Sequence, residues 1–309
     1  TPCCPILKRW LSGYVYLAED LSAQDSAIAA VGRPFFRRCG ALCRRPDSFF
    51  IRYWEQGPHI RIRVKLPATA LDEAKIILEA LVRQDAVAEF LGQPSSRPSE
   101  FAASGHPSLV WREYEPEILR YGGTEGIAVA ERFFAASSKL VLTLIDALAA
   151  QTLDRRGVGL VSLLALLSSF AQDRADAPSL VRRYAEQFHP VEQRISSSMN
   201  PQPSAYAALQ RQEELLAARI RHWWRLCATP TCLPVPFRRY ALAADRARDA
   251  LVRGIAIGSL VDRAGRTVGS LDEAVTQLCP SYMHMTSNRL GLSNREESYL
   301  AGLVSRALQ

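Results

Sequence analysis

The stretch YWEQGPHIRIRVK, residues 53–65, carries three side chains that together could bind an anion. His59, Arg61 and Arg63 occupy alternate positions, and a β-strand places alternate side chains on one face. Two guanidinium groups on one face can hold a carboxylate between them. The alternative is a solvated sheet face whose arginines bind no ligand.

Arg120 is a third candidate for binding an anion. It directly precedes Tyr121-Gly122-Gly123, where a strand-like run ends and the chain turns. The alternative is a salt bridge from Arg120 to Glu115 or Glu117.

His284 is a candidate acid or base. It lies between two methionines in YMHMTSN, and Tyr282, Ser287 and Asn288 place hydrogen-bond donors close to it in the sequence. Histidine among apolar neighbours is more often a core residue, and this is the alternative here.

Two adjacent tryptophans could stack a flat ligand or a peptide side chain. Trp223 and Trp224 follow His222 and are flanked by Arg221 and Arg225. The same run could equally be the buried side of a helix, with the arginine side chains reaching outward to solvent.

The composition favours an anionic partner. The 309 residues carry a net charge of +7 with a pI near 9.2, and arginine supplies nearly all of the positive charge. Arginine suits bidentate recognition of carboxylate or phosphate. The charge is spread along the chain, so direct nucleic-acid binding is not the favoured interpretation. No Walker loop, dinucleotide-binding, zinc-protease or nucleophile-elbow motif occurs, so those common chemistries have no support.

We predict neither a metal site nor a membrane segment. The seven cysteines match no paired zinc spacing, which favours inert thiols and leaves a disulfide between Cys227 and Cys232 open. No apolar run is long enough to span a bilayer, and the first residues lack the apolar block of a signal peptide. A cytoplasmic protein is therefore expected.

Strands are predicted in the first third of the chain and helices afterwards. Aromatic or β-branched runs predict strands at 12–18, 48–54 and 59–66, the last two joined through Gly57-Pro58. Apolar periodicity predicts helices at 69–92, 124–172, 207–227 and 240–265. This order indicates an α+β fold, with an antiparallel β-rich N-terminal part packed with a mainly helical C-terminal half.

The C-terminal region is predicted to begin with a short strand or turn around His284. A terminal helix follows, capped by Ser293, with Glu296 completing a capping box. Residues 92–108, rich in proline, glycine and serine, form a long loop of the kind that often covers a binding site. No linker divides the chain, so a single domain over residues 1–309 is expected.

Three blocks of this sequence, in this order, resemble the C-terminal domain of lantibiotic dehydratases, which also occurs as free-standing thiopeptide-type bacteriocin biosynthesis proteins. The blocks are FFIRYWEQGPHIRIRVK, EYEPEILRYGGTEGIAVAERFF and HMTSNRLGL. In the fused dehydratases this domain is similar to a lyase that removes glutamate from glutamylated serine or threonine of a ribosomal precursor peptide. The resemblance implies that Arg61, Arg63 and Arg120 hold the glutamyl carboxylate and that His284 assists proton transfer.

A second branch of the same superfamily is the pyridine synthases of thiopeptide pathways. They join two dehydroalanines in a formal 4+2 aza-cycloaddition, then lose water and expel the leader peptide as a carboxamide. For this branch the resemblance implies two sets of candidate residues. The first, of four residues from one segment, would transfer protons and orient substrate amides, and the second, of three residues, would bind the substrate. The first set is Tyr282, His284, Ser287 and Asn288, and the second is His59, Trp223 and Trp224.

Departures from a minimal elimination domain favour the synthase over the lyase. Segments 92–108 and 195–265 look like insertions, and Ala136 stands where an acidic residue is expected before the serine. The implied substrate is a ribosomal precursor peptide with an acidic leader, and other enzymes of the pathway are further candidate partners. No metal or organic cofactor, membrane or nucleic acid is implied.

Overall fold

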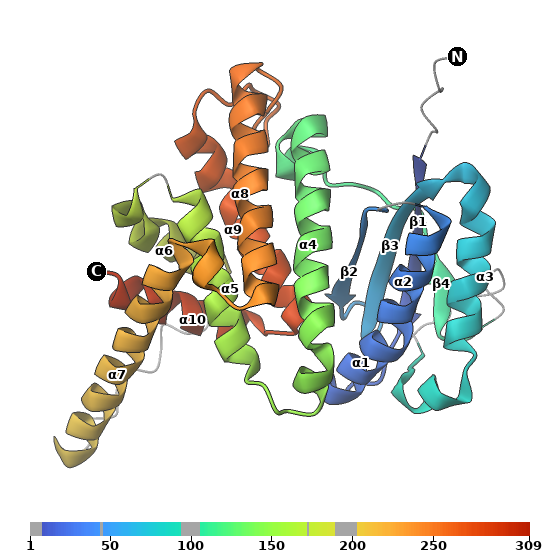
Figure 1. The fold of residues 1–309 in the computed structure, drawn as a ribbon, viewed down its shortest axis with the longest axis horizontal. Helices are drawn as coiled ribbons and strands as arrows, with labels where there is room; N and C mark the ends of the chain where they lie inside the picture. The colour runs from blue at the N-terminus through green and yellow to red at the C-terminus, as the bar shows by residue number, and fades with distance from the viewer. Residues whose placement is uncertain (1–7, 44–45, 94–105, 172, 189–202) are drawn as a thin grey trace. The chain divides into compact units, whose positions relative to one another are not determined.

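The computed structural model describes residues 8–43, 46–93, 106–171, 173–188 and 203–309 (Figure 1). The chain divides into two compact units. One comprises Thr1–Glu117 with Glu131–Asp154 and contains all of the described strands, so we call it the sheet unit. The other comprises Ile118–Ala130 with Arg155–Gln309, and we call it the helical unit.

The sheet unit contains a four-stranded antiparallel sheet in the order β2-β3-β1-β4. Its strands are β1 (Lys8–Tyr16), β2 (Ser48–Tyr53), β3 (His59–Pro67) and β4 (Leu109–Trp111). The three predicted strands are confirmed, with β1 starting earlier than expected. Gly57, at a φ of 107°, provides the positive φ that the predicted β2-β3 turn requires.

The two faces of β3 differ in character because its side chains alternate. Ile60, Ile62, Val64 and Leu66 are fully buried on one face, whereas Arg61 and the other cations lie half-buried on the opposite face. The apolar residues supply the sheet's share of a core that also includes three helices. These are α1 (Leu21–Ala27), α2 (Arg33–Leu42) and α3 (Leu71–Val82), with α2 packed against both β3 and α3.

The prediction missed or misplaced part of these helices. The sequence analysis assigned no helix to residues 21–42, where α1 and α2 are joined by a π-helical turn at Ile28–Gly32. The helix predicted at 69–92 ends at Val82, and a separate 3-10 turn follows at Asp85–Phe90.

The helical unit is a bundle around α5 (Arg155–Phe170), which is buried along most of its length. Five helices pack against α5: α6 (Ala177–Phe188), α7 (Pro203–Cys227), α8 (Val235–Ala256), α9 (Leu271–Leu290) and α10 (Asn294–Ala307). Gly159 permits close packing here, because a Cβ at this position would lie 2.7 Å from a methyl group of Leu292. Strands followed by helices confirm the predicted α+β fold class.

Helix α4 (Gly123–Ala149) supplies residues to both units, since residues 123–130 belong to the helical unit and 131–149 to the sheet unit. It was predicted as the first part of the helical region at 124–172, and α5 is the second part. The prediction of one domain over the whole chain stays a prediction.

The strand or turn predicted around His284 is wrong, because these residues lie in the middle of α9. The helix has strong end signals: Ser270 caps its N-terminus by accepting from Glu273 N, and Gly291 ends it at a φ of 77°. Pro280 removes one backbone donor inside the helix, yet the helix continues. The capping box of Ser293 and Glu296 at the start of α10 is confirmed.

Several other expectations have outcomes in the structure. Cys227 and Cys232 are free thiols, so the disulfide left open by the sequence does not form. The helix predicted at 240–265 is α8, which begins and ends earlier. Residues 94–105 of segment 92–108, and 195–202 of segment 195–265, lie outside the described residues. No helix in the described part of the chain is both long enough and apolar enough to cross a membrane.

Candidate functional site

A group of four side chains in the helical unit has the composition of an acid-base site, and we call it the His284 cluster. It contains His284 and Ser287 from α9, Glu297 from α10 and Tyr184 from α6. Nδ1 of His284 lies 3.0 Å from Oε2 of Glu297. The Tyr184 hydroxyl donates to the same oxygen at 2.5 Å and lies 3.3 Å from Oγ of Ser287.

Burial differs sharply between the two members of the histidine–carboxylate pair. The Glu297 side chain is 1% exposed and that of His284 is 22% exposed. A buried carboxylate needs hydrogen-bond donors, and His284 and Tyr184 both supply one to Oε2. Because Nδ1 is committed to Glu297, Nε2 is the ring nitrogen that can exchange a proton with a substrate.

Tyr184 is a permanent donor in this cluster. It is fully buried, and burial, followed by the negative charge of Glu297, raises its pKa well above the ordinary value. The phenol therefore stays protonated and fixes the carboxylate rather than exchanging protons itself.

The helical conformation of α9 decides which predicted residues lie together. His284, Ser287 and Asn288 are three and four residues apart, so they share one face of the helix, and all three are half-buried. Tyr282 lies elsewhere, fully buried, with its ring stacked on Tyr121 at 6.2 Å between centroids. The position of Tyr282 gives no support to its predicted part in proton transfer.

Arg120 is held close to the same segment of α9. It lies in a 3-10 turn, Leu119–Tyr121, that ends at Gly122 with a φ of 92°. Nε of Arg120 donates to Oγ of Ser281 at 3.4 Å, and Ser281 is three residues before His284. The structure therefore places the side chain of Arg120 against the turn of α9 that precedes His284.

The sheet unit contains His59, Arg61 and Arg63 on one face of β3, and we call these three residues the arginine row. His59 is not one of its cations, because burial lowers its pKa to about 4. Nδ1 of His59 lies 3.0 Å from the carbonyl oxygen of Gly57, and Nε2 accepts from Nε of Arg61 at 3.3 Å. Both contacts fit a neutral ring whose proton is on Nδ1.

Arg61 is already occupied by neighbours within its own unit. Its guanidinium carbon lies 3.3 Å from the ring centroid of Tyr53 and 4.6 Å from that of Tyr14. Its Nη2 also lies 3.9 Å from a carboxylate oxygen of Glu55. Arg61 therefore has aromatic and anionic partners without any ligand.

Arg63 lies deeper than Arg61 and is less completely satisfied. Its guanidinium carbon is 4.2 Å from the ring centroid of Tyr114, and its burial lowers its pKa from the ordinary arginine value. Tyr14 forms a side-chain hydrogen bond with it, whereas its Nε has no hydrogen-bond partner among the described residues. This donor is buried away from solvent, so its missing partner is an energetic cost within the row and does not make it a contact for a ligand.

Glu131 is an acidic residue beside the arginine row that the sequence analysis missed. It is 5% exposed, and burial raises its pKa, opposed by a hydrogen bond from Tyr114 and by the charges of Lys65 and Arg63. A lone acid among the apolar residues of 127–134 was the available signal. Glu131 is therefore a buried acidic neighbour of the row.

The two tryptophans do not form a joint platform. Trp224 is 8% exposed, and the guanidinium carbon of Arg174 lies 4.0 Å from its ring centroid. Trp223 is half-buried, and its ring meets that of His222 edge to face at 6.4 Å. The buried-helix alternative describes Trp224, and only Trp223 keeps a partly accessible ring.

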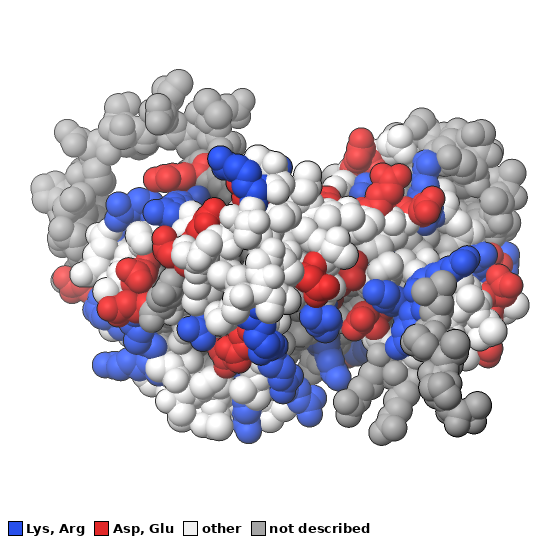
Figure 2. All heavy atoms as spheres, turned by 90° about the horizontal axis from the view of Figure 1, so that it is seen from above, with Lys and Arg blue, Asp and Glu red and all other residues white. Residues whose placement is uncertain are grey.

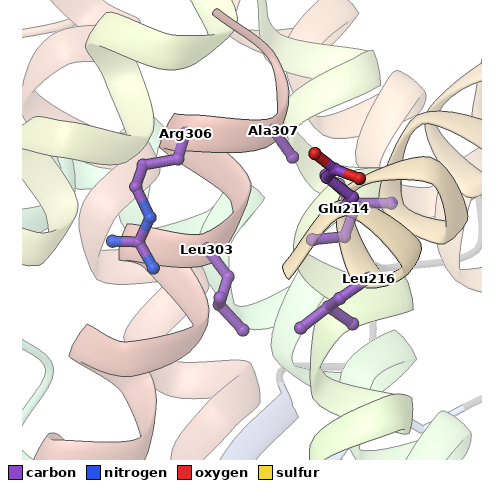
Figure 3. Close-up of a pocket in the computed structure, with 7 residues that line it drawn as sticks. Glu214, Leu216, Leu303, Arg306 and Ala307 are labelled. Carbon is purple, nitrogen blue, oxygen red and sulfur yellow. The ribbon is translucent and has the colours of Figure 1, made fainter. Parts of the chain in front are cut away.

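Two pockets lie in the helical unit. One, of about 330 Å³, lies between α7 and α10, with Glu214 and Arg306 on opposite sides of an apolar floor that includes Leu216 and Leu303 (Figure 3). The other, of about 190 Å³, lies between α6 and the first turns of α9, and no member of the His284 cluster lines it. No three metal-binding side chains gather around a common point within the described ranges.

Two members of the cluster, Tyr184 and Glu297, were not predicted from the sequence. Tyr184 lies far from His284 in the sequence, and Glu297 lies next to a residue of a helix-capping motif. Tyr184 belongs to α6, which was not predicted. Glu297 follows the capping residue Glu296, so the acidic pair was assigned to the helix end. Glu297 lies three, four and seven residues before the buried Leu300, Ala301 and Val304, and this position on an apolar face was the readable signal.

Comparisons with known proteins agree over nearly the whole chain. The family model described as "Lantibiotic biosynthesis dehydratase C-term" matches residues 10–308. Nisin biosynthesis protein NisB of Lactococcus lactis subsp. lactis is 31% identical over 99 residues, which are 32% of this chain and 8% of NisB. The match thus covers under a tenth of that curated relative.

Solved structures share the fold. TbtD, the pyridine synthase from thiomuracin biosynthesis, superposes with a TM-score of 0.70 at 17% identity and covers 97% of both chains. TsrL gives 0.61 at 19% identity, covering 97% of this chain and 94% of that one. The tRNA-dependent lantibiotic dehydratase MibB from Microbispora sp. 107891 gives 0.59 at 21% identity, covering 99% of this chain and 28% of MibB.

Proposed function

This chain belongs to the lantibiotic biosynthesis dehydratase C-terminal family, and on that premise we propose that it is an enzyme that matures a ribosomally made peptide in a thiopeptide pathway. The proposed reaction is that of a pyridine synthase, which joins two dehydroalanines of one precursor peptide into a six-membered nitrogen ring. The fold similarity is higher to TbtD, at a TM-score of 0.70, than to the dehydratase MibB, at 0.59, and this supports the choice of a synthase.

The His284 cluster is the observation that carries the proposal. The reaction needs proton transfer at three points, and a half-buried imidazole oriented by a buried carboxylate can both accept and donate protons. Ser287, on the same face of α9, adds a hydroxyl that can orient a substrate amide.

Each chemical step then has an assigned group. One dehydroalanine and the amide before it take the iminol form, and His284 moves the proton from the amide nitrogen to the carbonyl oxygen. Two carbon–carbon bonds form with the second alkene. The hydroxyl then takes a proton from His284 and leaves as water, and a ring carbon returns a proton to His284. The amide nitrogen of the leader leaves as a carboxamide in the same way, with one proton gained from His284 and one ring-carbon proton returned to it. Holding the two alkenes together is the larger contribution of the protein.

The state of the arginine row supports a synthase over a lyase. Arg61 lies against Tyr53 and Tyr14 and is paired with Glu55, and Glu131 lies near Arg63. A site built to hold a free glutamyl carboxylate would need these charges for the ligand. In a synthase the row can instead stabilise the sheet.

Incubation with a thiazole-bearing peptide that contains two dehydroalanines behind a leader tests the proposal. Mass spectrometry should detect the leader as a carboxamide together with the ring product. His284→Ala should lose both products, whereas His222→Ala, an exposed histidine of α7, should keep them. An inactive wild-type protein that binds the peptide would instead identify an adaptor without chemistry.

A glutamate-eliminating lyase is the second candidate, favoured by one observation. Arg61, Arg63, Arg120 and His284, the residues that the resemblance assigns to this activity, are all present. This activity predicts glutamate release from a peptide with a glutamylated serine, and its complete loss in Arg63→Ala. An intact glutamylated peptide would eliminate this candidate.

A further inference from the structure

The solvent-facing side of α8 has the residue spacing of a helix-packing seam, and we call it the α8 stripe. Its positions alternate steps of four and three residues, as in a coiled coil. They are Val235, Arg239, Leu242, Arg246, Asp249 and Arg253, all exposed. The opposite side of α8 is buried, with Tyr240, Ala244 and Leu251 in the bundle. One face of α8 is thus satisfied by the fold, and the other has no partner in the described chain.

The three arginines of the stripe carry uncompensated charge. Arg239, Arg246 and Arg253 form no hydrogen bond or ion pair with any residue that the structure describes. Asp249, the acid among them, is 3.6 Å from Arg248 instead. Because the arginines are seven residues apart, their Cα atoms repeat every ~10 Å along the helix.

Exposed aliphatic side chains lie on the same helix and at its C-cap residue, Ile257. Val235 is 49% exposed, Leu242 39%, Val252 40% and Ile257 76%, which are four of the eleven large hydrophobic residues exposed in the described chain. A face that only kept α8 hydrated would carry polar residues at these positions. Aliphatic residues beside free cations are typical of a surface that buries a partner.

We propose that the α8 stripe binds an acidic amphipathic peptide helix. A helix repeats its contact face every seven residues, so carboxylates at one heptad position would meet the three arginines, with aliphatic residues at the other position against Leu242 and Val235. An extended peptide fits less well, because residues three apart, which cover the same length, point to opposite sides.

The observations favour a peptide over nucleic acid or a lipid surface. Phosphate backbones need cations and make no use of the exposed valines and leucine. A membrane-bound helix keeps its basic residues on the face opposite its aliphatic ones, whereas here arginines interrupt the aliphatic row. Basic and acidic side chains are also intermixed over the face shown in Figure 2, rather than gathered in one basic field.

Which natural peptide binds the α8 stripe is a separate question from whether the stripe binds an acidic helix. Its natural occupant would be the acidic leader of the precursor peptide, and that identification rests on the proposed function. Docking of an acidic helix does not rest on the proposed function, because it is measured as binding without turnover. Failure of docking would leave the chemistry of His284 standing, and failure of the chemistry would leave the docking surface standing.

A designed peptide probe tests the docking surface. The probe is a labelled helix of roughly three heptads with Glu at one contact position and Leu at the other. Fluorescence anisotropy should show binding by the wild-type protein that weakens with added salt. Reversing all three arginines, Arg239→Glu, Arg246→Glu and Arg253→Glu together, should weaken binding at least about tenfold, since three charge pairs are lost.

A control variant separates the stripe from the net charge. Arg37→Glu, Arg38→Glu and Arg263→Glu together change the net charge equally at exposed sites outside α8. This control should bind the probe like the wild type, and circular dichroism should show both variants folded. Equal weakening in the two variants would overturn the proposal. So would tighter binding of a single-stranded oligonucleotide or of phosphatidylserine vesicles through the same three arginines.

Discussion

Nδ1 of His284 lies 3.0 Å from Oε2 of Glu297, a carboxylate that the fold removes almost completely from solvent. The two residues come from consecutive helices, α9 and α10, and the loop between them holds only Gly291, Leu292 and Ser293. Oε1 of Glu297 has no hydrogen-bond partner among the described residues. The carboxylate is thus committed to the imidazole and to Tyr184 through one oxygen.

Glu297→Gln should lower turnover while leaving the fold intact. The amide keeps the size of the carboxylate but can present its NH2 group to Nδ1, which favours the wrong tautomer of His284. We expect kcat to fall at least about tenfold with little change in KM, because oriented acid–base catalysis is lost rather than binding. Steady-state kinetics over a range of pH should also show a changed profile.

Glu296→Gln is the matched control for this prediction. Glu296 is the neighbouring acid, and it belongs to the capping box with Ser293 and pairs with Arg156 at 3.0 Å. Its loss should cost about 0.5–1 kcal/mol of stability without changing the pH profile. Equal kinetics for the two variants would show that Glu297 only fills space.

Removing Arg63 should destabilise the sheet unit, in part through Glu131. Arg63→Met takes away a guanidinium that lies over the Tyr114 ring and hydrogen-bonds Tyr14, together with a positive charge that favours ionised Glu131, so we expect a loss of about 2 kcal/mol in the free energy of unfolding. Adding Glu131→Gln should recover part of that loss. Urea unfolding of the single and double variants measures the coupling, expected near ~1 kcal/mol, and additive effects would contradict it.

Acid should destabilise the fold through His59. Its pKa is about 4 in the folded protein and 6.5 ordinarily, so between these values the unfolded chain binds a proton that the folded chain does not. The unfolding free energy should therefore fall as the pH drops from about 6.5 to about 4, by about 3 kcal/mol from this residue.

His59→Phe should remove most of that pH dependence. Phenylalanine keeps a ring against Tyr14, whose centroid lies 5.2 Å from that of His59, but it cannot be protonated. Urea unfolding at about pH 7 and about pH 4.5 compares the two proteins. His222→Phe, at an exposed position, should keep the wild-type difference in unfolding free energy between the two pH values. The same difference in His59→Phe would contradict the assignment of this pH dependence to His59.

Gly122→Ala should affect both stability and turnover. The residue has a φ of 92°, which costs alanine about 1–2 kcal/mol, and it follows the turn that holds Arg120 against Ser281. Gly265→Ala is the control, since Gly265 has a φ of 80° with open space around it. Both variants should lose similar stability in thermal unfolding, and only Gly122→Ala should lose turnover.

Local patterns predicted the sheet but not the conformation around His284. The β2-β3 hairpin followed from short β-branched runs and Gly57, because the turn and the alternation act between neighbouring residues. The residues around His284 were predicted as a short strand or turn. Their helix is stabilised instead by packing of α9 against α5 and α6, which a local pattern does not contain.

Individual residues of the candidate site could be predicted from the sequence, whereas the residues that contact them in the fold could not. His284, Ser287 and Arg120 stood out by type and by resemblance. Glu297 and Tyr184 acquire their role from helix packing between α6, α9 and α10, so their sequence neighbours carry no sign of it. The neutral state of His59 likewise depends on its burial in the folded sheet unit, which its alternating position in the sequence does not reveal.

A comparison of two peptides tests the proposed synthase most directly. Both carry the same leader and thiazoles, one with two dehydroalanines and the other with a glutamylated serine, and each is mixed with excess wild-type protein and followed by mass spectrometry. We predict that the first peptide loses water and releases its leader as a carboxamide while the second stays intact. Glutamate release from the second peptide, with the first unchanged, would contradict the synthase and assign the chain to elimination.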